Sequence, residues 1–115
     1  MHDLLEAREA RFGENQSLFR AVNERVESIS DNGANRSPVS FLCECANTDC
    51  DNQIDLSLDE YEAIRQDSTH FFVLHDHVFP DVEAVVEERA SYVIVEKFGQ
   101  DGRVAAATDE RRIAP

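Results

Sequence analysis

The chain has no tryptophan, only one lysine (Lys97) and few basic residues: 11 Lys and Arg stand against 24 Asp and Glu, a net charge of −13. Proteins bind nucleic acids mainly through Lys and Arg side chains, which displace the counterions of the phosphates. A surface with this excess of acid repels such a polyanion, and it repels an anionic membrane surface for the same reason. We therefore expect neither a nucleic acid nor a membrane as the partner.

Long apolar runs are also missing. A membrane-spanning helix needs roughly 18 or more consecutive apolar residues, and charged residues interrupt every stretch of this chain. The first residues, MHDLLEAREARFGENQ, carry charges throughout and lack the apolar centre of a secretory signal. We expect a cytoplasmic protein, in which thiols stay reduced. An odd count of 3 cysteines does not suit a disulfide framework, so metal binding or a reactive thiol remains.

The chain of 115 residues predicts one α+β domain with an additional long helix. That helix is expected within residues 1–33, where apolar residues recur every seven positions and "DNG" ends the pattern. The stripe either packs on the rest of the domain or also pairs with a second copy in a homodimer. Its members are Leu5, Phe12, Phe19 and Val26, with Asn15, Val22 and Ile29 three positions further on.

Residues 34–100 predict a small metal-stabilised domain, a β-hairpin and sheet with two short helices. Ser57 and Glu60 form the pattern of a capping box at the start of the first short helix. The segment HFFVLH predicts a central strand because its apolar run is nearly continuous, and PDVEAVVEERA predicts the second helix, with its valines on one face and its glutamates in solvent. "GQDG" predicts a turn, and residues 101–115 a flexible tail.

All the cysteines lie in the stretch FLCECANTDC, as Cys43, Cys45 and Cys50. A C-x-C pair on a tight turn can direct both sulfur atoms at one cation, and the "ANTD" turn brings the third cysteine back towards them. Structural zinc sites need four ligands and commonly use three cysteines and one histidine. Of the histidines, His75 and His77 lie in a turn after the 70–75 strand, and the spacing leaves both open as the fourth ligand.

Four stretches carry a resemblance to a known family: FRAVNERVE (19–27), FLCECANTDCDNQIDLSLDEYEAIR (41–65), FFVLHDHVFP (71–80) and YVIVEK (92–97). The chain resembles a functionally uncharacterised family of small proteins from high-GC Gram-positive bacteria, which shares an FxCECxxxxC…H motif. In that motif the histidine before the proline corresponds to His77, whereas the position of His75 usually holds another residue. The resemblance therefore implies His77 as the fourth ligand, and it implies no activity.

We interpret the chain as a zinc-binding protein with a structural site of Cys43, Cys45, Cys50 and His77, and as a protein–protein interaction or regulatory adaptor module without enzymatic activity. One alternative is a redox or sensor protein in which the same ligands hold a [2Fe–2S] cluster. A second alternative is a metal-dependent hydrolase that uses His70, His75 and His77, because an open three-ligand site can activate water.

Overall fold

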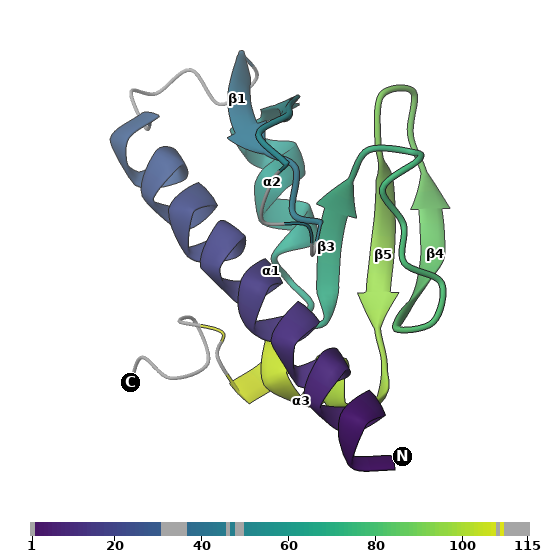
Figure 1. Cartoon of the computed structure of the whole chain (residues 1–115). Helices are drawn as coiled ribbons and strands as arrows, with labels where there is room; N and C mark the ends of the chain where they lie inside the picture. Colours follow the sequence, from purple (N-terminus) through teal and green to yellow (C-terminus); the bar gives the residue numbers. More distant parts are fainter. Residues whose placement is uncertain (1, 31–36, 46, 48–49, 108, 110–115) are drawn as a thin grey trace.

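The computed structural model of the chain describes residues 2–30, 37–45, 47, 50–107 and 109. A long helix, α1 (His2–Ser30), lies beside two small antiparallel sheets and two short helices (Figure 1). The expectation of a small α+β fold with a long N-terminal helix is confirmed. The predicted end of this helix at "DNG" (31–33) and residues 34–36 of the loop expected after it lie outside the described residues.

The first sheet is a hairpin of β1 (Pro38–Leu42) and β2 (Gln53–Ser57), in which Phe41 lies opposite Ile54. Side chains alternate between the two faces of a strand, and Phe41, Ile54 and Leu56 face the core. Phe41 stacks on Tyr61 of α2, with 4.5 Å between the ring centroids. The hairpin thus presents one apolar face to the domain and leads directly into the cysteine loop, residues 43–50.

The second sheet has the order β3-β5-β4, with β3 at His70–Val73, β4 at Glu83–Glu88 and β5 at Val93–Lys97. The prediction that β3 is central is wrong, because β5 takes that place. β3 is apolar although it lies at the edge of its sheet, because another segment packs against that edge. The backbone N–H of Glu44 donates to the Phe72 carbonyl (3.0 Å). The cysteine loop therefore covers the edge of β3 that β5 leaves free, and Phe71, Phe72 and Val73 are all buried.

The predicted capping box at the start of α2 (Leu58–Ile64) is confirmed. The Ser57 hydroxyl accepts from the N–H of Glu60 (3.1 Å), and the Glu60 carboxylate accepts from the N–H of Ser57 (3.0 Å). These two bonds satisfy N–H groups that the first turn of a helix leaves without an intrahelical partner. The helix buries Tyr61 and Ile64, so it closes over the hairpin.

The helix predicted for residues 80–90 is a strand, β4, and its prediction was wrong. The valines fit a helical face, but β-branched residues also suit a strand, and β5 offers an edge with which the segment pairs. A bulge between Val85 and Glu87 interrupts the alternation that would have indicated a strand. Glu83 is buried rather than solvated, in an ion pair with Lys97, whereas Glu87 and Glu88 are exposed as expected.

The second short helix is α3 (Gly99–Ala107), which starts where a turn was predicted. Gly99 has a positive φ of 62°, a conformation that costs glycine little and lets the chain leave β5 sharply. Residues 101–107, assigned from the sequence to a flexible tail, form most of α3. This helix packs across α1 (Figure 1) and buries Ala105.

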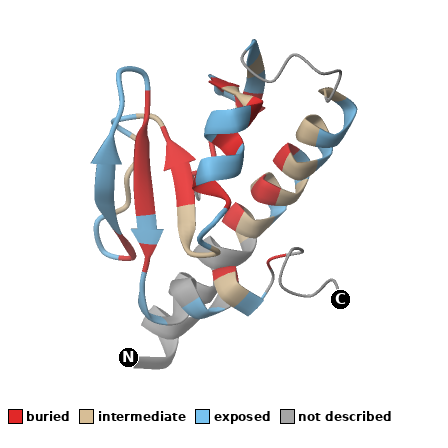
Figure 2. Cartoon of the chain, turned by 180° about the vertical axis from the view of Figure 1, so that it is seen from behind, coloured by how far each residue is buried: buried red, intermediate tan, exposed pale blue. Residues whose placement is uncertain are grey.

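The side of α1 that faces the domain is polar. Gln16, Arg20 and Asn23 are buried. They follow one another at intervals of four and three residues, which places them on one face of the helix. Figure 2 shows buried residues along β3 and β5 and on one side of α1. Of the predicted apolar stripe, Phe19 and Val26 are half-buried, and Val26 packs against the core. The side chains of Leu5 and Phe12 lie outside the described residues.

Candidate metal centre

Two turns bring the cysteine loop and His77 together. The N–H of Cys43 donates to the Asn52 carbonyl (2.9 Å), which continues the β1–β2 pairing by one step beyond the strands. On the other side, the chain turns just after β3, where the N–H of His77 donates to the Leu74 carbonyl (2.9 Å). Because the cysteine loop covers the edge of β3, the histidine after that strand faces the sulfur atoms.

The ligand atoms of Cys43, Cys45, Cys50 and His77 all lie within 4.8 Å of one another. The Nδ1 atom of His77 is 3.5 Å from the sulfur of Cys43 and 3.5 Å from that of Cys50. Cys43 and Cys45 are buried, while Cys50 and His77 are half-buried. The structure thus brings together the four residues predicted as ligands, in a group that could hold a metal ion.

Cys43 and Cys50 each accept a hydrogen bond at sulfur from a nearby N–H group. The N–H of Leu74 lies 3.4 Å from Cys43 Sγ, and the side-chain amide of Asn52 lies 3.6 Å from Cys50 Sγ. A hydrogen bond shared with Cys43 lowers the pKa of the Cys45 thiol to about 5 and raises that of Cys43. Donors of this kind favour negative sulfur, and the thiolate is the form of cysteine that binds metals.

The other histidines lie elsewhere. His75 Nε2 forms a hydrogen bond with the Arg89 carbonyl (3.0 Å), in the connection between β4 and β5. His70 opens β3, beside Asp67 and Glu96, and the side chain of His2 lies outside the described residues. Among the residues that the structure describes, His70, His75 and His77 form no common metal-ligand group, so the structure does not assemble the histidine triad of the hydrolase alternative.

Glu44, between the first two cysteines, points into the protein and is fully buried. Its carboxylate accepts from the side-chain amide of Asn23 (2.9 Å) and from the N–H of Phe72 (3.4 Å). Burial raises the pKa of Glu44 to about 7, although the Asn23 hydrogen bond opposes this shift. The side-chain amide of Gln16 donates to the Glu44 carbonyl (3.2 Å). Side chains of α1 therefore bind both the backbone and the side chain of Glu44 in the C-x-C segment.

Asn23 also pairs with the backbone of the residue before Cys43. Its amide oxygen accepts from the N–H of Leu42 (2.8 Å), and its amide nitrogen donates to the Leu42 carbonyl (3.0 Å). These contacts were not predicted from the sequence, because the apolar stripe of α1 was expected to be its buried side. The available signal was the helical spacing of Gln16, Arg20 and Asn23.

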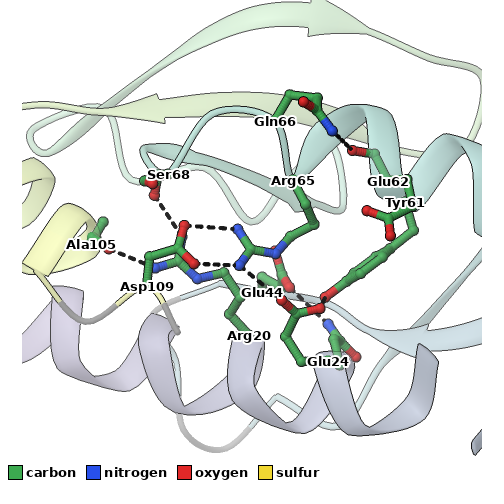
Figure 3. Close-up of polar contacts among 11 residues, drawn as sticks. Arg20, Glu24, Glu44, Tyr61, Glu62, Arg65, Gln66, Ser68, Ala105 and Asp109 are labelled. Carbon is green, nitrogen blue, oxygen red and sulfur yellow. Dashed lines mark hydrogen bonds and ion pairs between the residues drawn. The ribbon is translucent and has the colours of Figure 1, made fainter. Parts of the chain in front are cut away.

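A second buried polar group joins the three helices (Figure 3). Arg65 at the end of α2 binds Asp109 (2.8 Å) and Glu24 of α1 (3.0 Å). Arg20 donates to the carbonyl oxygens of Ser68 and Ala105, at 2.6 Å each. Both guanidinium groups are buried, and their contacts fix α1 and α3 against the turn before β3.

None of the helices in the described part of the chain has the length and apolar character that crossing a bilayer requires. Comparisons of the sequence with protein-family models and with curated proteins, and of the fold with solved structures, gave no match. The resemblance to a family of high-GC Gram-positive bacteria therefore stays a prediction.

Proposed function

We propose that the protein binds one structural zinc ion through Cys43, Cys45, Cys50 and His77. The observation that carries the proposal is the spacing of the ligand atoms. In a tetrahedral site, bonds of about 2.3 Å to sulfur and about 2.0–2.1 Å to nitrogen separate a sulfur from a nitrogen by about 3.5 Å. Both distances from His77 Nδ1 to Cys43 and Cys50 equal 3.5 Å.

The donor set supports a structural role. Three sulfur donors and one imidazole complete the tetrahedron of a zinc ion and leave no position for water or substrate, as in structural Cys3His sites. A bound ion joins the turn after β1 to the turn after β3, which are distant in sequence. Structural zinc binds with about 10–16 kcal/mol in small domains, comparable with the whole stability of a domain. For a short chain with a thin core, the ion therefore determines whether the domain folds.

The compactness of the site favours a single ion over the [2Fe–2S] alternative. In such a cluster two irons share the four protein ligands, so ligands on different irons are held apart by the cluster itself. Here all four ligand atoms lie within 4.8 Å of one another, which supports one shared ion.

We propose that the function is protein–protein interaction, with the protein acting as an adaptor or regulatory module, because a zinc ion with four protein ligands leaves no position for a substrate. The outer face of α1 supports this proposal. Leu18, Val22 and Ile29 expose 60%, 41% and 75% of their surface, and their spacing places them on one side of the helix. A second copy of the chain is the partner we propose for this face, because Val22 and Ile29 belong to the seven-residue pattern typical of paired helices.

Metal analysis of protein purified without a metal-binding tag tests the zinc site. We expect about one zinc per chain and a visible spectrum without bands, because zinc has a filled d shell. A brown protein with iron and sulfide would instead support the cluster, and a metal-free but stably folded protein would refute both proposals.

A further inference from the structure

We propose that the protein has a second divalent-cation site, formed by Asp67, His70 and Glu96 and suited to Zn²⁺. The two carboxylates and the imidazole come from the turn before β3, the first residue of β3 and the end of β5. Their ligand atoms all lie within 4.8 Å of one another. The group shares no residue with the cysteine centre.

The backbone places the three residues side by side. His70 lies directly opposite Glu96 in the antiparallel pairing of β3 and β5, and directly opposite residues project to the same face of a sheet. Asp67 reaches the same point from the preceding turn, where its Oδ2 lies 3.5 Å from His70 Nε2. On the other side of Glu96, the neighbour across β4 is Ala84, whose small side chain leaves this face open.

Contacts from outside the three residues hold the turn. The buried guanidinium of Arg20 donates to the Ser68 carbonyl (2.6 Å), and the N–H of Lys97 donates to the Thr69 carbonyl (2.9 Å). Asp67 Oδ1 accepts from the N–H and the hydroxyl of Thr69, at 2.9 and 2.7 Å. The second oxygen of Asp67 is therefore directed at His70, and the three ligands meet an incoming cation with little rearrangement, which favours binding.

The chemistry of the donors selects the cation. One imidazole and two carboxylates suit zinc and other first-row transition metals, whereas magnesium and calcium prefer oxygen ligands alone. The adjacent Lys97 does not neutralise the carboxylates, because its side chain is buried in the ion pair with Glu83. The net charge of −13 also raises the local concentration of cations at the surface.

Three protein ligands leave at least one position of a tetrahedral zinc ion to water, and all three residues are exposed or half-buried. We therefore expect weaker binding than at the cysteine centre. The two sites lie at opposite ends of β3: His70 begins the strand, and Leu74, four residues later and about 13 Å along it, contacts Cys43. The second site thus acts as a separate, exchangeable site.

Calorimetric titration of the full chain with Zn²⁺ tests the proposal, with metal already bound at the cysteine centre left in place. We expect one further ion per chain in the wild type, and at least tenfold weaker binding in His70→Ala and in Glu96→Gln. The matched control is His75→Ala, which removes an exposed histidine outside both groups and leaves this step unchanged. In two-dimensional NMR spectra, Co²⁺ is expected to shift the amide signals of residues 67–70 and 96 in the wild type and not in Glu96→Gln.

An equal number of weakly bound ions in the wild type and both variants would overturn the proposal, and so would the absence of any weak step in the wild type. Both results leave the cysteine centre untouched, because that centre is measured by the metal that copurifies with the chain. Conversely, a protein without copurified metal that still binds one ion through His70 would refute the proposed function and support the second site.

Discussion

His75 and His77 stand two residues apart, yet their rings have different partners. The His77 ring lies 3.5 Å from two sulfur atoms, and the His75 ring is hydrogen-bonded to the Arg89 carbonyl (3.0 Å). In a regular strand, residues two apart would point the same way. The chain turns after β3 instead, as the bond from the His77 N–H to the Leu74 carbonyl shows, and this turn separates the two rings.

We predict that His77→Ala releases metal to a chelator much faster than the wild type, whereas His75→Ala releases it at the wild-type rate. Removing His77 leaves three sulfur ligands and one open position, and His75 is turned towards another loop. A colorimetric zinc indicator follows the release, and circular dichroism checks that both variants are folded. Equal release from the two variants would show that His77 is not the fourth ligand.

At the scale of single elements, α1 connects to the cysteine loop through its buried amides. Asn23 binds both backbone groups of Leu42 and the carboxylate of Glu44, and Gln16 binds the carbonyl of Glu44. Residues that hydrogen-bond to metal ligands and hold them in position commonly contribute a factor of about 10–100 to metal affinity. The helix is therefore part of the support of the metal centre as well as of the core.

We predict that Asn23→Ala lowers metal affinity about tenfold and the free energy of unfolding by about 3 kcal/mol, because it leaves buried groups on Leu42 and Glu44 without partners. Ser28→Ala, at an exposed position of the same helix outside the proposed interface, is the control and is expected to change neither value. Chelator competition and urea denaturation measure the two effects. Unchanged metal affinity in a destabilised Asn23→Ala protein would mean that α1 supports the core alone.

The cap of α2 permits a second prediction at this scale. Ser57→Ala removes the hydroxyl that accepts from Glu60 N–H, and we expect it to lower the free energy of unfolding by about 1 kcal/mol, the usual effect of losing a helix cap. Metal content should stay at the wild-type level, because the cap lies at the far end of β2 from the cysteine loop. Thermal denaturation with metal analysis measures both, and loss of metal would contradict this separation.

For the whole molecule, the four candidate ligands come from the loop after β1 and the turn after β3, so the proposed zinc ion joins the hairpin to the three-stranded sheet. We predict that removing the metal with a chelator unfolds most of the domain, since the binding energy of a structural zinc ion is also folding energy. As the pH is lowered, protons compete with the metal for the thiolates. A stronger chelator should therefore remove the metal at a higher pH than a weaker one. Far-ultraviolet circular dichroism follows the change, and a stable, fully folded metal-free protein would show that the core suffices.

The outer face of α1 gives a prediction about assembly. We expect light scattering to report twice the mass of one chain, and Ile29→Glu and Val22→Glu to give folded monomers, because both residues are exposed in the single chain. Phe19→Glu is expected to destabilise the fold as well, since Phe19 is half-buried. If the wild-type protein has the mass of one chain even at high concentration, the proposal that a second copy binds this face is wrong.

Local patterns in the sequence determined the elements that depend on neighbouring residues. The long helix, the capped α2 and the hairpin around the cysteines were predicted, because seven-residue periodicity, capping residues and alternation act over a few positions. The three cysteines were also identified as one group from their spacing. The resemblance to a known motif, rather than spacing, selected His77 from two histidines.

Only the tertiary structure decided which surfaces meet. The segment 83–88 forms β4 because β5 offers it an edge, and α3 forms where α1 provides a surface to pack on. The buried side of α1 is polar because it packs on the cysteine loop and on the turn before β3. The backbone N–H and C=O groups of these segments need hydrogen-bond partners once they are buried. The helical spacing of Gln16, Arg20 and Asn23 marks one face of α1, but nothing in the sequence marks the distant groups that this face meets. The pairing of His70 with Glu96 across two strands is another contact of this kind.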